Sequence, residues 1–321
     1  MRPSISIIIP LFNKSPYIEA TLGAFLKQLH VGEEIIVVDD FSTDGGPDIA
    51  ERLLTGAPGC RLVKMPQNVG PGSARNAGAR LAKGTHLLFF DADDIPSSTL
   101  LNELRAAIDQ FPGDHIFTYK IAFQARGENF TKTNFSETER RRRHAFVSDS
   151  IQGRTLCTAS STCVTRFAFD GAEGFLEGLR YCEDPELWSR LSAQFDVIVI
   201  NNVLAIYQDV PQSLSYGWRG HLGSANPYID TLLKLSLNHG NQYKLLARTM
   251  IFRNIFFAKS AGTLRSDISK QLQKYRKELG CLNYFLLKFF NFTPSFFIET
   301  FEKWRANLNK SKFKRILNNL N

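Results

Sequence analysis

The sequence predicts an α/β fold in which a mostly parallel β-sheet is flanked by helices and followed by a C-terminal helical extension. Over the first hundred residues, short apolar runs alternate with segments whose apolar residues recur at helical spacing. Repeated βα units of this length favour a parallel sheet with helices on both faces. Polar residues follow the ends of the predicted strands, which is where such sheets bind ligands.

The first half of the chain supplies the clearest elements. Residues 5–9 form a β-branched apolar run, which suits a strand covered on both faces. Ser15 is expected to cap the next helix, with Pro16 in its first turn. Further strands are predicted at residues 34–38, 61–64 and 86–90, and further helices around Ile49 and over residues 72–83.

The second half continues the alternation with longer polar stretches. We predict helices over residues 100–111 and 183–194, and strands over residues 115–123 and 197–201. Residues 127–144 are polar and basic, and are expected to form a mobile loop or an extended hairpin. The predicted domains are an α/β domain over residues 1–217, with halves at 1–95 and 96–217, and a helical, aromatic and basic region over residues 218–321.

An acidic run follows the fourth predicted strand. Asp91, Asp93 and Asp94 come directly after the apolar residues 87–90. Carboxylates repel one another, so bringing them together is costly unless a positive charge lies between them. Hard divalent cations such as Mg²⁺ or Mn²⁺ bind such oxygen ligands, and they usually bring a phosphate. The alternative is that these acids cap the next helix or solvate a turn.

Composition and charge exclude several classes of protein. The five cysteines are scattered without a CxxC pair, so neither a zinc site nor a disulfide framework is indicated, and reduced thiols fit best. The N-terminus lacks the layout of a signal peptide. No apolar run approaches the roughly 18 residues of a membrane span. We therefore expect a cytoplasmic protein.

The net charge of +8 belongs to the C-terminal end. Residues 265–321 hold 12 Lys or Arg against 4 Asp or Glu, and the preceding residues are neutral. Seven phenylalanines lie between Leu282 and Phe301, close to this basic cluster. Aromatic and basic residues together suit the surface of an anionic membrane. The alternatives are that the phenylalanines pack on the protein or form a dimer interface, and no nucleic-acid-binding fold is indicated.

Four ordered motifs identify a family. Residues 5–13 (ISIIIPLFN), 34–44 (EIIVVDDFSTD), 68–78 (NVGPGSARNAG) and 87–94 (LLFFDADD) resemble successive motifs of family 2 glycosyltransferases, which have the Rossmann-like GT-A fold. The resemblance covers residues 4–215. It implies a nucleotide-sugar donor, which we expect to be a UDP-sugar. It also implies a Mn²⁺ or Mg²⁺ cofactor and inversion at the anomeric carbon.

The donor site is expected along the ends of these strands. Phe12 can stack on a pyrimidine ring, and Asp40 can accept a hydrogen bond from its N–H. The alternatives are that Phe12 belongs to the core, that Asp39 and Asp40 cap the next helix, and that Arg75 forms a surface salt bridge. The resemblance implies a nucleotide-sugar site formed by Pro10, Phe12, Asn13, Asp40, Asn68, Gly70, Arg75, Asp91 and Ala92.

The resemblance also implies the catalytic groups. Asp93 and Asp91 would hold the metal, which neutralises the charge that develops on the departing diphosphate. Glu183 and Asp184 resemble the family's ED motif, in which Asp184 would be the general base for the acceptor hydroxyl. Since Pro185 follows it, Asp184 is alternatively an ordinary helix N-cap.

Two features depart from the family pattern. Val210 stands where related sequences often carry a histidine, so a third metal ligand would have to be another group, such as Asp209, or water. The QxxRW motif of processive enzymes is absent from the sequence, which favours the addition of one sugar per encounter.

The sequence therefore predicts a non-processive, inverting glycosyltransferase of surface polysaccharide or lipopolysaccharide biosynthesis. Its partners would be a UDP-sugar, a glycan or lipid-linked glycan acceptor, and an anionic membrane on whose cytoplasmic face it is peripheral. Two alternatives stay open. One is a non-catalytic nucleotide- or glycan-binding protein with the same fold. The other is a nucleotidyltransferase, although no Gly-rich basic loop for a triphosphate follows the first strand.

Overall fold

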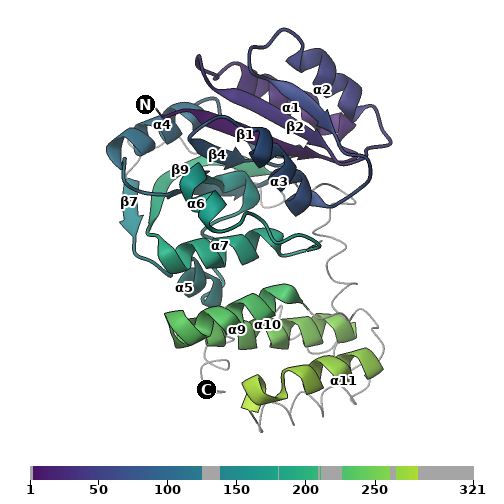
Figure 1. Cartoon of the computed structure of the whole chain (residues 1–321), viewed down its shortest axis with the longest axis vertical. Coiled ribbons are helices and arrows are strands. Elements are labelled where there is room, and N and C mark those ends of the chain that lie inside the picture. Colours follow the sequence, from purple (N-terminus) through teal and green to yellow (C-terminus); the bar gives the residue numbers. More distant parts are fainter. Residues whose placement is uncertain are drawn as a thin grey trace. The chain divides into compact units, whose positions relative to one another are not determined.

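The computed structural model describes residues 3–124, 138–179, 181–208, 210, 226–260 and 265–280 (Figure 1). The chain divides into two compact units. The first contains Met1–Ser213 together with Asp230–Leu246, and the second contains Leu214–Ile229 and Ala247–Asn321. The sequence places a domain boundary near residue 217, and the first unit takes in a later helical segment as well.

The strands and helices predicted from the sequence are present, with bounds that differ by a few residues, and further elements that were not predicted lie at residues 95–96, 138–141, 145–151 and 162–171. The strands are β1 (Ile5–Leu11), β2 (Glu34–Asp39), β3 (Arg61–Lys64), β4 (His86–Phe89), β5 (Ile95–Pro96), β6 (Ile116–Phe123), β7 (Thr138–Arg141), β8 (Thr162–Thr165) and β9 (Val197–Tyr207). The helices are α1 (Ser15–Leu26), α2 (Gly46–Leu54), α3 (Pro71–Leu81), α4 (Leu100–Gln110), α5 (Ala145–Ile151), α6 (Arg166–Gly171), α7 (Glu183–Gln194), α9 (Pro227–His239), α10 (Asn241–Ser260) and α11 (Arg265–Lys274), with a 3₁₀ turn η2 (Ala159–Ser161).

The described strands form one mixed sheet. Their order is β3-β2-β1-β4-β8-β6-β9-β5, and β7 pairs with β9. Strand β1 is parallel to both β2 and β4, and β3 is parallel to β2. Strand β8 is antiparallel to β4 and β6, so the second half of the sheet adds antiparallel pairs. The predicted α/β class, with a sheet between helices, is confirmed.

Helices cover both faces of the sheet, which explains the continuous apolar character of the strands. On one face, Ile7 and Ile9 of β1 belong to a core cluster with Leu22 and Phe25 of α1, and with residues of α2 and α4. On the other face lies α3. A Cβ atom added to Gly78 of α3 would come within 2.6 Å of Ile8, the β1 residue between those two. The glycine therefore lets α3 lie close against the sheet.

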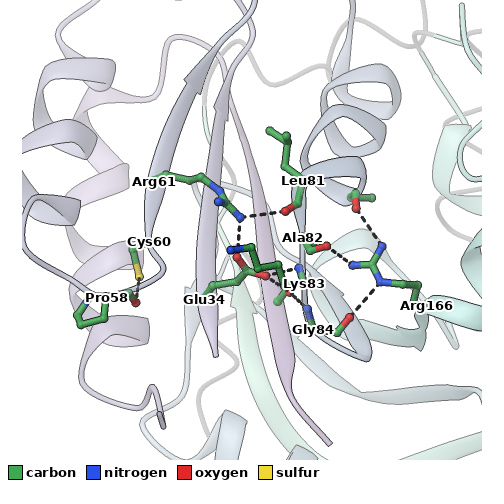
Figure 2. A network of polar contacts seen from close by, with 11 residues as sticks. Glu34, Pro58, Cys60, Arg61, Leu81, Ala82, Lys83, Gly84 and Arg166 are labelled. Atoms are coloured by element: carbon green, nitrogen blue, oxygen red, sulfur yellow. Dashed lines mark hydrogen bonds and ion pairs between the residues drawn. The ribbon is translucent and has the colours of Figure 1, made fainter. Parts of the chain in front are cut away.

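A buried polar network ties the far end of α3 to the sheet (Figure 2). The carboxylate of Glu34 accepts hydrogen bonds from Ser6 Oγ at 2.7 Å and Arg61 Nη2 at 2.6 Å, and it also contacts the backbone N–H of Lys83. Ser6 Oγ in turn accepts from Gly84 N at 2.8 Å. The loop between α3 and β4 is thus bound to β1 and β2. This fixes the directions of α3 and β4 relative to the sheet.

Arg166 fastens the same loop from another side (Figure 2). Its guanidinium donates to the carbonyl oxygens of Ala79, Ala82 and Gly84 at 3.2, 2.6 and 3.2 Å. These carbonyls belong to the last turn of α3 and the loop after it, where helix carbonyls have no intrahelical partner. Arg166 thus satisfies one carbonyl in the last turn of α3 and two in the segment directly after it.

Two local predictions need correction. Ser15 was expected to be a helix cap, but Lys14 is the N-cap residue of α1, and the N–H of Ser15 donates to Asp44 Oδ2 at 2.8 Å. The carboxylate of Asp44, and not the hydroxyl of Ser15, therefore accepts a hydrogen bond from a backbone N–H at the start of α1. The strand predicted over residues 197–201 extends to Tyr207, because β9 pairs along its length with β6.

The described part of the C-terminal region is helical, as predicted. In the second unit, Arg248 of α10 donates a hydrogen bond from Nε to the carbonyl of Glu278 at 2.7 Å. Among the described residues, no helix is both long and apolar enough to span a membrane. The phenylalanine-rich segment and its basic cluster, residues 281–321, lie outside the described residues, as does most of the loop expected over residues 127–144.

Candidate active site

The predicted site lies along one edge of the sheet. Strands β1, β2 and β4 are parallel neighbours, with Leu11 of β1 beside Asp39 and Ile8 beside Phe89. Their carboxyl ends therefore meet at the same edge, and the loops that follow them lie next to one another. The chain passes from β1 outwards to β2 and β3 and then returns to β4 on the other side of β1. This reversal is the position at which open α/β sheets bind ligands.

The loops after β1 and β2 are bound to each other through Asn13. Its backbone has a φ of 52°, in the left-handed region that asparagine tolerates. The N–H of Asn13 donates to Ser42 Oγ at 3.1 Å, and its Oδ1 accepts from Thr43 N at 2.8 Å. Asn13 thus holds the loop that carries Phe12 against the loop that carries Phe41.

Phe12 and Phe41 both present their rings to solvent. Phe12 is 42% exposed and Phe41 is 53% exposed, so the alternative that Phe12 belongs to the core is wrong. Phe41 has a φ of 68°, which is costly for an aromatic residue and therefore needs support from its surroundings. Phe41 was not among the predicted site residues. It could have been found as an exposed aromatic candidate, because it directly follows Asp40 in a polar turn.

Asp40, Asn68 and Gly70 come together as predicted from their place in the motifs. The two carboxylate oxygens of Asp40 accept hydrogen bonds from Val69 N at 2.7 Å and Gly70 N at 2.8 Å. Asn68 Nδ2 donates to the carbonyl of Asp40 at 3.1 Å. The alternative that Asp40 caps the next helix is wrong, since this carboxylate orders the loop before α3 instead. Gly70 has a φ of 86°, a conformation for which glycine is suited.

Arg75 joins the two ends of the site. Its Nη2 lies 2.5 Å from Asp91 Oδ1, after β4, and its Nη1 lies 2.9 Å from Glu183 Oε1, at the start of α7. The side chain is 3% exposed, so the alternative of a surface salt bridge is wrong. Burial opposes its charge, but Asp91 and Glu183 outweigh burial and raise the pKa of Arg75 above its usual value. Arg75 is therefore a fixed cation between two carboxylates.

Helix α1 holds the acidic turn after β4. The hydroxyl of Thr21 donates to the carbonyls of Ala92 and Asp94 at 3.0 and 2.9 Å. The side chain of Ala92 is buried in the core, so this residue supports the turn rather than presenting a side chain to the site. The N–H of Asp91 donates to Ser160 Oγ at 3.0 Å. As a result, the side chains of Asp91 and Asp93 remain partly accessible while their backbone is fixed.

The acids of this turn have different environments. Burial and the charge of Asp91 raise the pKa of Asp93, while Lys14 lowers it, with Nζ at 2.5 Å from Asp93 Oδ2. Burial and Asp91 raise the pKa of Asp94 well above its usual value, which favours a protonated carboxyl. Lys14 was not selected by the sequence analysis, because a lone lysine after an asparagine carries no distinctive pattern.

The donor set fits a divalent cation that is shared with a substrate. Among the residues that the structure describes, no group of three or more His, Cys, Asp or Glu side chains is arranged to hold a metal ion. Asp91 and Asp93 provide carboxylate oxygens, the ligands that Mg²⁺ and Mn²⁺ prefer. Mg²⁺ is commonly held by one or two carboxylates together with substrate phosphates, and these two residues fit that arrangement. Val210 is buried, and Asp209 lies outside the described residues.

Asp184 lies in the first turn of α7, close to the same cluster. The N-cap residue of this helix is Cys182, with a φ of 64°, so the alternative that Asp184 is the N-cap is wrong. Burial first, and then the charge of Glu183, raise the pKa of Asp184 to about 8, against the opposing effect of Arg75. Asp184 is therefore a much better proton acceptor than an ordinary carboxylate.

Helix α3 brings α7 to this position. A Cβ atom on Gly72 would lie 3.3 Å from both Cβ and Cγ of Glu183, so the glycine allows the close approach. Asn76 binds the turn before α7 twice, through Nδ2 to Phe175 O at 2.8 Å and through Oδ1 from Phe175 N at 2.9 Å. The ring of Phe175 also lies 5.4 Å from the guanidinium of Arg75. The start of α7, which carries Asp184, is thus joined to Asp91 through Arg75.

Glu186 extends the fixed part of α7. It pairs with Arg190 at 2.6 Å and accepts a hydrogen bond from Thr231 of α9 at 2.8 Å. Arg190 also donates to the carbonyls of Ala172 and Gly174, the latter at 2.7 Å. The start of α7 is therefore held from several sides, and the position of Asp184 is well defined.

Comparisons with solved structures agree with this fold. A crystal structure of residues 1–349 of TarS from S. aureus in complex with UDP-GlcNAc is similar, with a TM-score of 0.64, 18% identity, and coverage of 86% of this chain and 82% of that one. The mannosyltransferase PcManGT from Pyrobaculum calidifontis, in complex with GDP-Man and Mn²⁺, has a TM-score of 0.51 at 18% identity and covers 91% and 84% of the two chains. At this identity the likeness concerns the fold alone.

Sequence comparisons give the family. The putative teichuronic acid biosynthesis glycosyltransferase TuaG of Bacillus subtilis is 38% identical over 93 residues, which are 29% of this chain and 37% of TuaG. The chain spans between 32% and 43% of the length of the first curated relatives that it matches. The sequence model described as Glycosyl transferase family 2 matches residues 6–171, which is more than half of the chain. The chain therefore belongs to glycosyl transferase family 2.

Proposed function

We propose that the protein transfers one sugar per encounter from a UDP-sugar to a hydroxyl of a glycan acceptor, with inversion at the anomeric carbon. The observation that carries this proposal is the bridge made by Arg75, which contacts Asp91 at 2.5 Å and Glu183 at 2.9 Å. It joins the carboxylates expected to face the donor with the helix turn that carries Asp184. In the proposal, one site would therefore contain groups for the departing diphosphate and for the attacking hydroxyl.

The nucleotide would lie over the loops after β1 and β2. In the proposal, the exposed ring of Phe12 stacks on the base and Pro10 lies beside it. The carboxylate of Asp40 accepts hydrogen bonds from Val69 N and Gly70 N, and in the proposal it also accepts one from a base N–H. Asn13, Asn68 and Gly70 hold these loops in place.

Asp91 and Asp93 would orient the ribose and the diphosphate through a bound Mn²⁺ or Mg²⁺. When bound, such a cation supplies Lewis-acid stabilisation of the negative charge that develops on the leaving group. Arg75 keeps one oxygen of Asp91 fixed, so this carboxylate does not need to reorganise when the donor arrives. The buried Ala92 between the two acids keeps their backbone rigid.

Asp184 would act on the opposite face of the sugar. Its carboxylate accepts the proton of the acceptor hydroxyl as that oxygen bonds to the anomeric carbon. The bond from the anomeric carbon to the phosphate oxygen breaks in the same step, and the electron pair leaves with the diphosphate. A general base works best when its pKa is near the working pH, and burial raises the pKa of Asp184 to about 8.

The relatives support the choice of substrates. TarS binds UDP-GlcNAc and UDP in its crystal structures, and TuaG is named for teichuronic acid biosynthesis. PcManGT binds Mn²⁺ together with its nucleotide sugar. We include in the proposal a role in surface polysaccharide or lipopolysaccharide biosynthesis. Residues 281–321 would dock the protein on an anionic membrane that carries a lipid-linked acceptor.

The proposal is tested by incubating the purified protein with Mn²⁺ and a panel of UDP-sugars, with and without oligosaccharide acceptors. We expect one UDP-sugar to release UDP, faster with acceptor, and the product to have the opposite anomeric configuration by NMR. Binding of UDP without turnover of any sugar nucleotide would favour the non-catalytic alternative. Retention of the anomeric configuration would contradict the role of Asp184 as the base.

A further inference from the structure

Lys14 forms an ion pair with Asp93, one of the two residues proposed to hold the cation. Its Nζ is 2.5 Å from Asp93 Oδ2, and the two side chains are only 19% and 15% exposed. Water screens a pair at this depth less than it screens a surface pair. While Lys14 occupies Asp93, this carboxylate is already neutralised, and a second cation at the same oxygen would be repelled.

The two cations of the site are held differently. Arg75 is buried and binds Asp91 and Glu183 at once, so it is a permanent part of the site. Lys14 binds Asp93 through a single ammonium at the end of a four-carbon chain, which can turn without moving the backbone. Lys14 is therefore the exchangeable cation of the pair.

The backbone of Lys14 is fixed, so only its side chain needs to move. Its carbonyl accepts hydrogen bonds from Tyr17 N at 3.0 Å and Ile18 N at 3.1 Å in the first turn of α1. On its two sides, Asn13 N is bound to Ser42 and Ser15 N is bound to Asp44. To leave Asp93, the ammonium therefore has to move through its own side-chain torsions, and in the proposed function the donor diphosphate would lie beside this carboxylate. Lysine ammonium groups bind phosphate as compact point charges.

We propose that Lys14 is an internal counter-ion of Asp93 that competes with a divalent cation for this carboxylate until the donor binds. Lys14 keeps Asp93 neutral in the free protein, gives it up when a divalent cation binds, and then contacts the diphosphate of the nucleotide sugar. The consequence is that the metal binds weakly alone and more tightly with the nucleotide, because only the nucleotide gives the displaced ammonium a new partner. The contact between Lys14 and the diphosphate rests on the proposed function. The competition between Lys14 and the metal for Asp93 does not.

The test measures Mn²⁺ binding without nucleotide, from the EPR signal of free Mn²⁺, in the wild type and in Lys14→Met. We expect Lys14→Met to bind Mn²⁺ about tenfold more tightly, since the metal no longer competes with the ammonium. Lys14→Arg keeps a competing cation and should stay within about twofold of the wild type. Equal or weaker Mn²⁺ binding by Lys14→Met would overturn the proposal.

Lys27→Met is the matched control. Lys27 is an exposed residue at the C-terminal end of the same helix, about 20 Å along the axis from Lys14. It changes the net charge by the same amount, so Mn²⁺ binding should not change by more than about twofold. If Lys27→Met tightens Mn²⁺ binding as much as Lys14→Met does, only net charge matters and the proposal fails. The unfolding temperature of each variant in EDTA checks that it is folded.

Addition of UDP tests the second half. We expect UDP to increase the Mn²⁺ affinity of the wild type by a larger factor than that of Lys14→Met, which has no ammonium to transfer. If UDP increases the Mn²⁺ affinity of both proteins by the same factor, Lys14 does not contact the diphosphate. Asp93→Asn is the reference, and it should lose Mn²⁺ binding in either background. If no variant binds UDP, the proposed function fails, while the competition for Asp93 is still decided by Mn²⁺ alone.

Discussion

The guanidinium of Arg75 lies between Asp91 and Glu183, and its charge offsets the repulsion between these two carboxylates. It is 3% exposed and contacts Asp91 and Glu183 through different nitrogens. Taking one partner away from a buried ion pair is costly, because the remaining charge is left without compensation. The fork of the arginine also sets the distance between its two carboxylates, which an ammonium cannot do.

Arg75→Lys should therefore destabilise the protein although it keeps the charge. One of the two contacts is lost, and we expect the free energy of unfolding to fall by about 1–3 kcal/mol in a denaturant titration. Arg80→Lys, at an exposed position of the same helix, is the control and should change stability by less than about 0.5 kcal/mol. Equal effects at both positions would mean that the bridge contributes nothing.

Asp184→Asn separates catalysis from stability. Without the carboxylate, we expect kcat to fall at least about 100-fold while UDP binding is kept, because the base does not touch the nucleotide in the proposal. In the wild type, kcat/KM should rise with pH towards about 8, the pKa to which burial raises Asp184. Full activity of the variant, or a flat profile from acidic to alkaline pH, would contradict the assignment.

The same substitution should stabilise the fold at alkaline pH. The pKa of Asp184 is raised from 3.8 to about 8, so between these values the folded protein holds a proton that the unfolded chain releases. Stability from this group is complete below 3.8 and is lost as the pH rises through 8. Asparagine does not ionise, so Asp184→Asn should have a higher unfolding temperature than the wild type at pH 9, and a smaller gain at pH 5.

Individual residues show what sequence could and could not predict. Phe12, Asp40, Arg75 and Asp184 were selected from motifs, and the alternatives of core, helix-cap and surface positions are wrong for them. Lys14 was missed, because its significance depends on a contact with Asp93 that joins residues 79 positions apart. Partners of this kind follow from the fold and not from local spacing.

Among the elements, α3 is the one on which the geometry of the site depends most. It begins at the loop bound by Asp40, carries Arg75, packs against β1 through Gly78 and contacts α7 through Gly72. Its far end is held by the Glu34 network and by Arg166 (Figure 2). The small residues of this helix allow such close packing. The sequence could not show which neighbours it would approach, because these come from β1, β2 and α7.

Gly78→Ala should destabilise the protein although alanine is the better helix former. The added Cβ would lie 2.6 Å from Ile8 Cγ2 and 3.1 Å from Val38 Cγ2, so α3 must shift from the sheet. Overpacking of this kind costs about 1–3 kcal/mol, measured as the free energy of unfolding. Arg75 and Glu183 should move with the helix, and activity should fall as well.

Gly23→Ala is the matched control in α1. A Cβ at this position meets nothing within 4 Å, so the same change should stabilise the protein by about 0.5–1 kcal/mol through helix propensity alone. Opposite signs at the two glycines would support the packing assigned to α3. A loss of stability at Gly23 equal to that at Gly78 would contradict it.

At the scale of the whole molecule, every residue assigned to the site comes from the first unit. That unit contains Met1–Ser213 and Asp230–Leu246. The α/β class and the succession of the first strands and helices along the chain could be predicted, because apolar runs and helical spacing are local properties of the chain. The antiparallel pairs of β8 with β4 and β6 were not predicted, since pairing between distant strands leaves no local pattern.

The central claim is that acids from separate strand ends and from α7 serve one donor, through a cation at Asp91 and Asp93. The most direct measurement is a crystal structure of the protein with Mn²⁺ and UDP, with the metal located by its anomalous signal. We expect one Mn²⁺ coordinated by Asp93 and by oxygens of the diphosphate, with Lys14 turned from Asp93 towards the phosphates. A metal bound elsewhere, or UDP bound away from the loops after β1, β2 and β4, would contradict it.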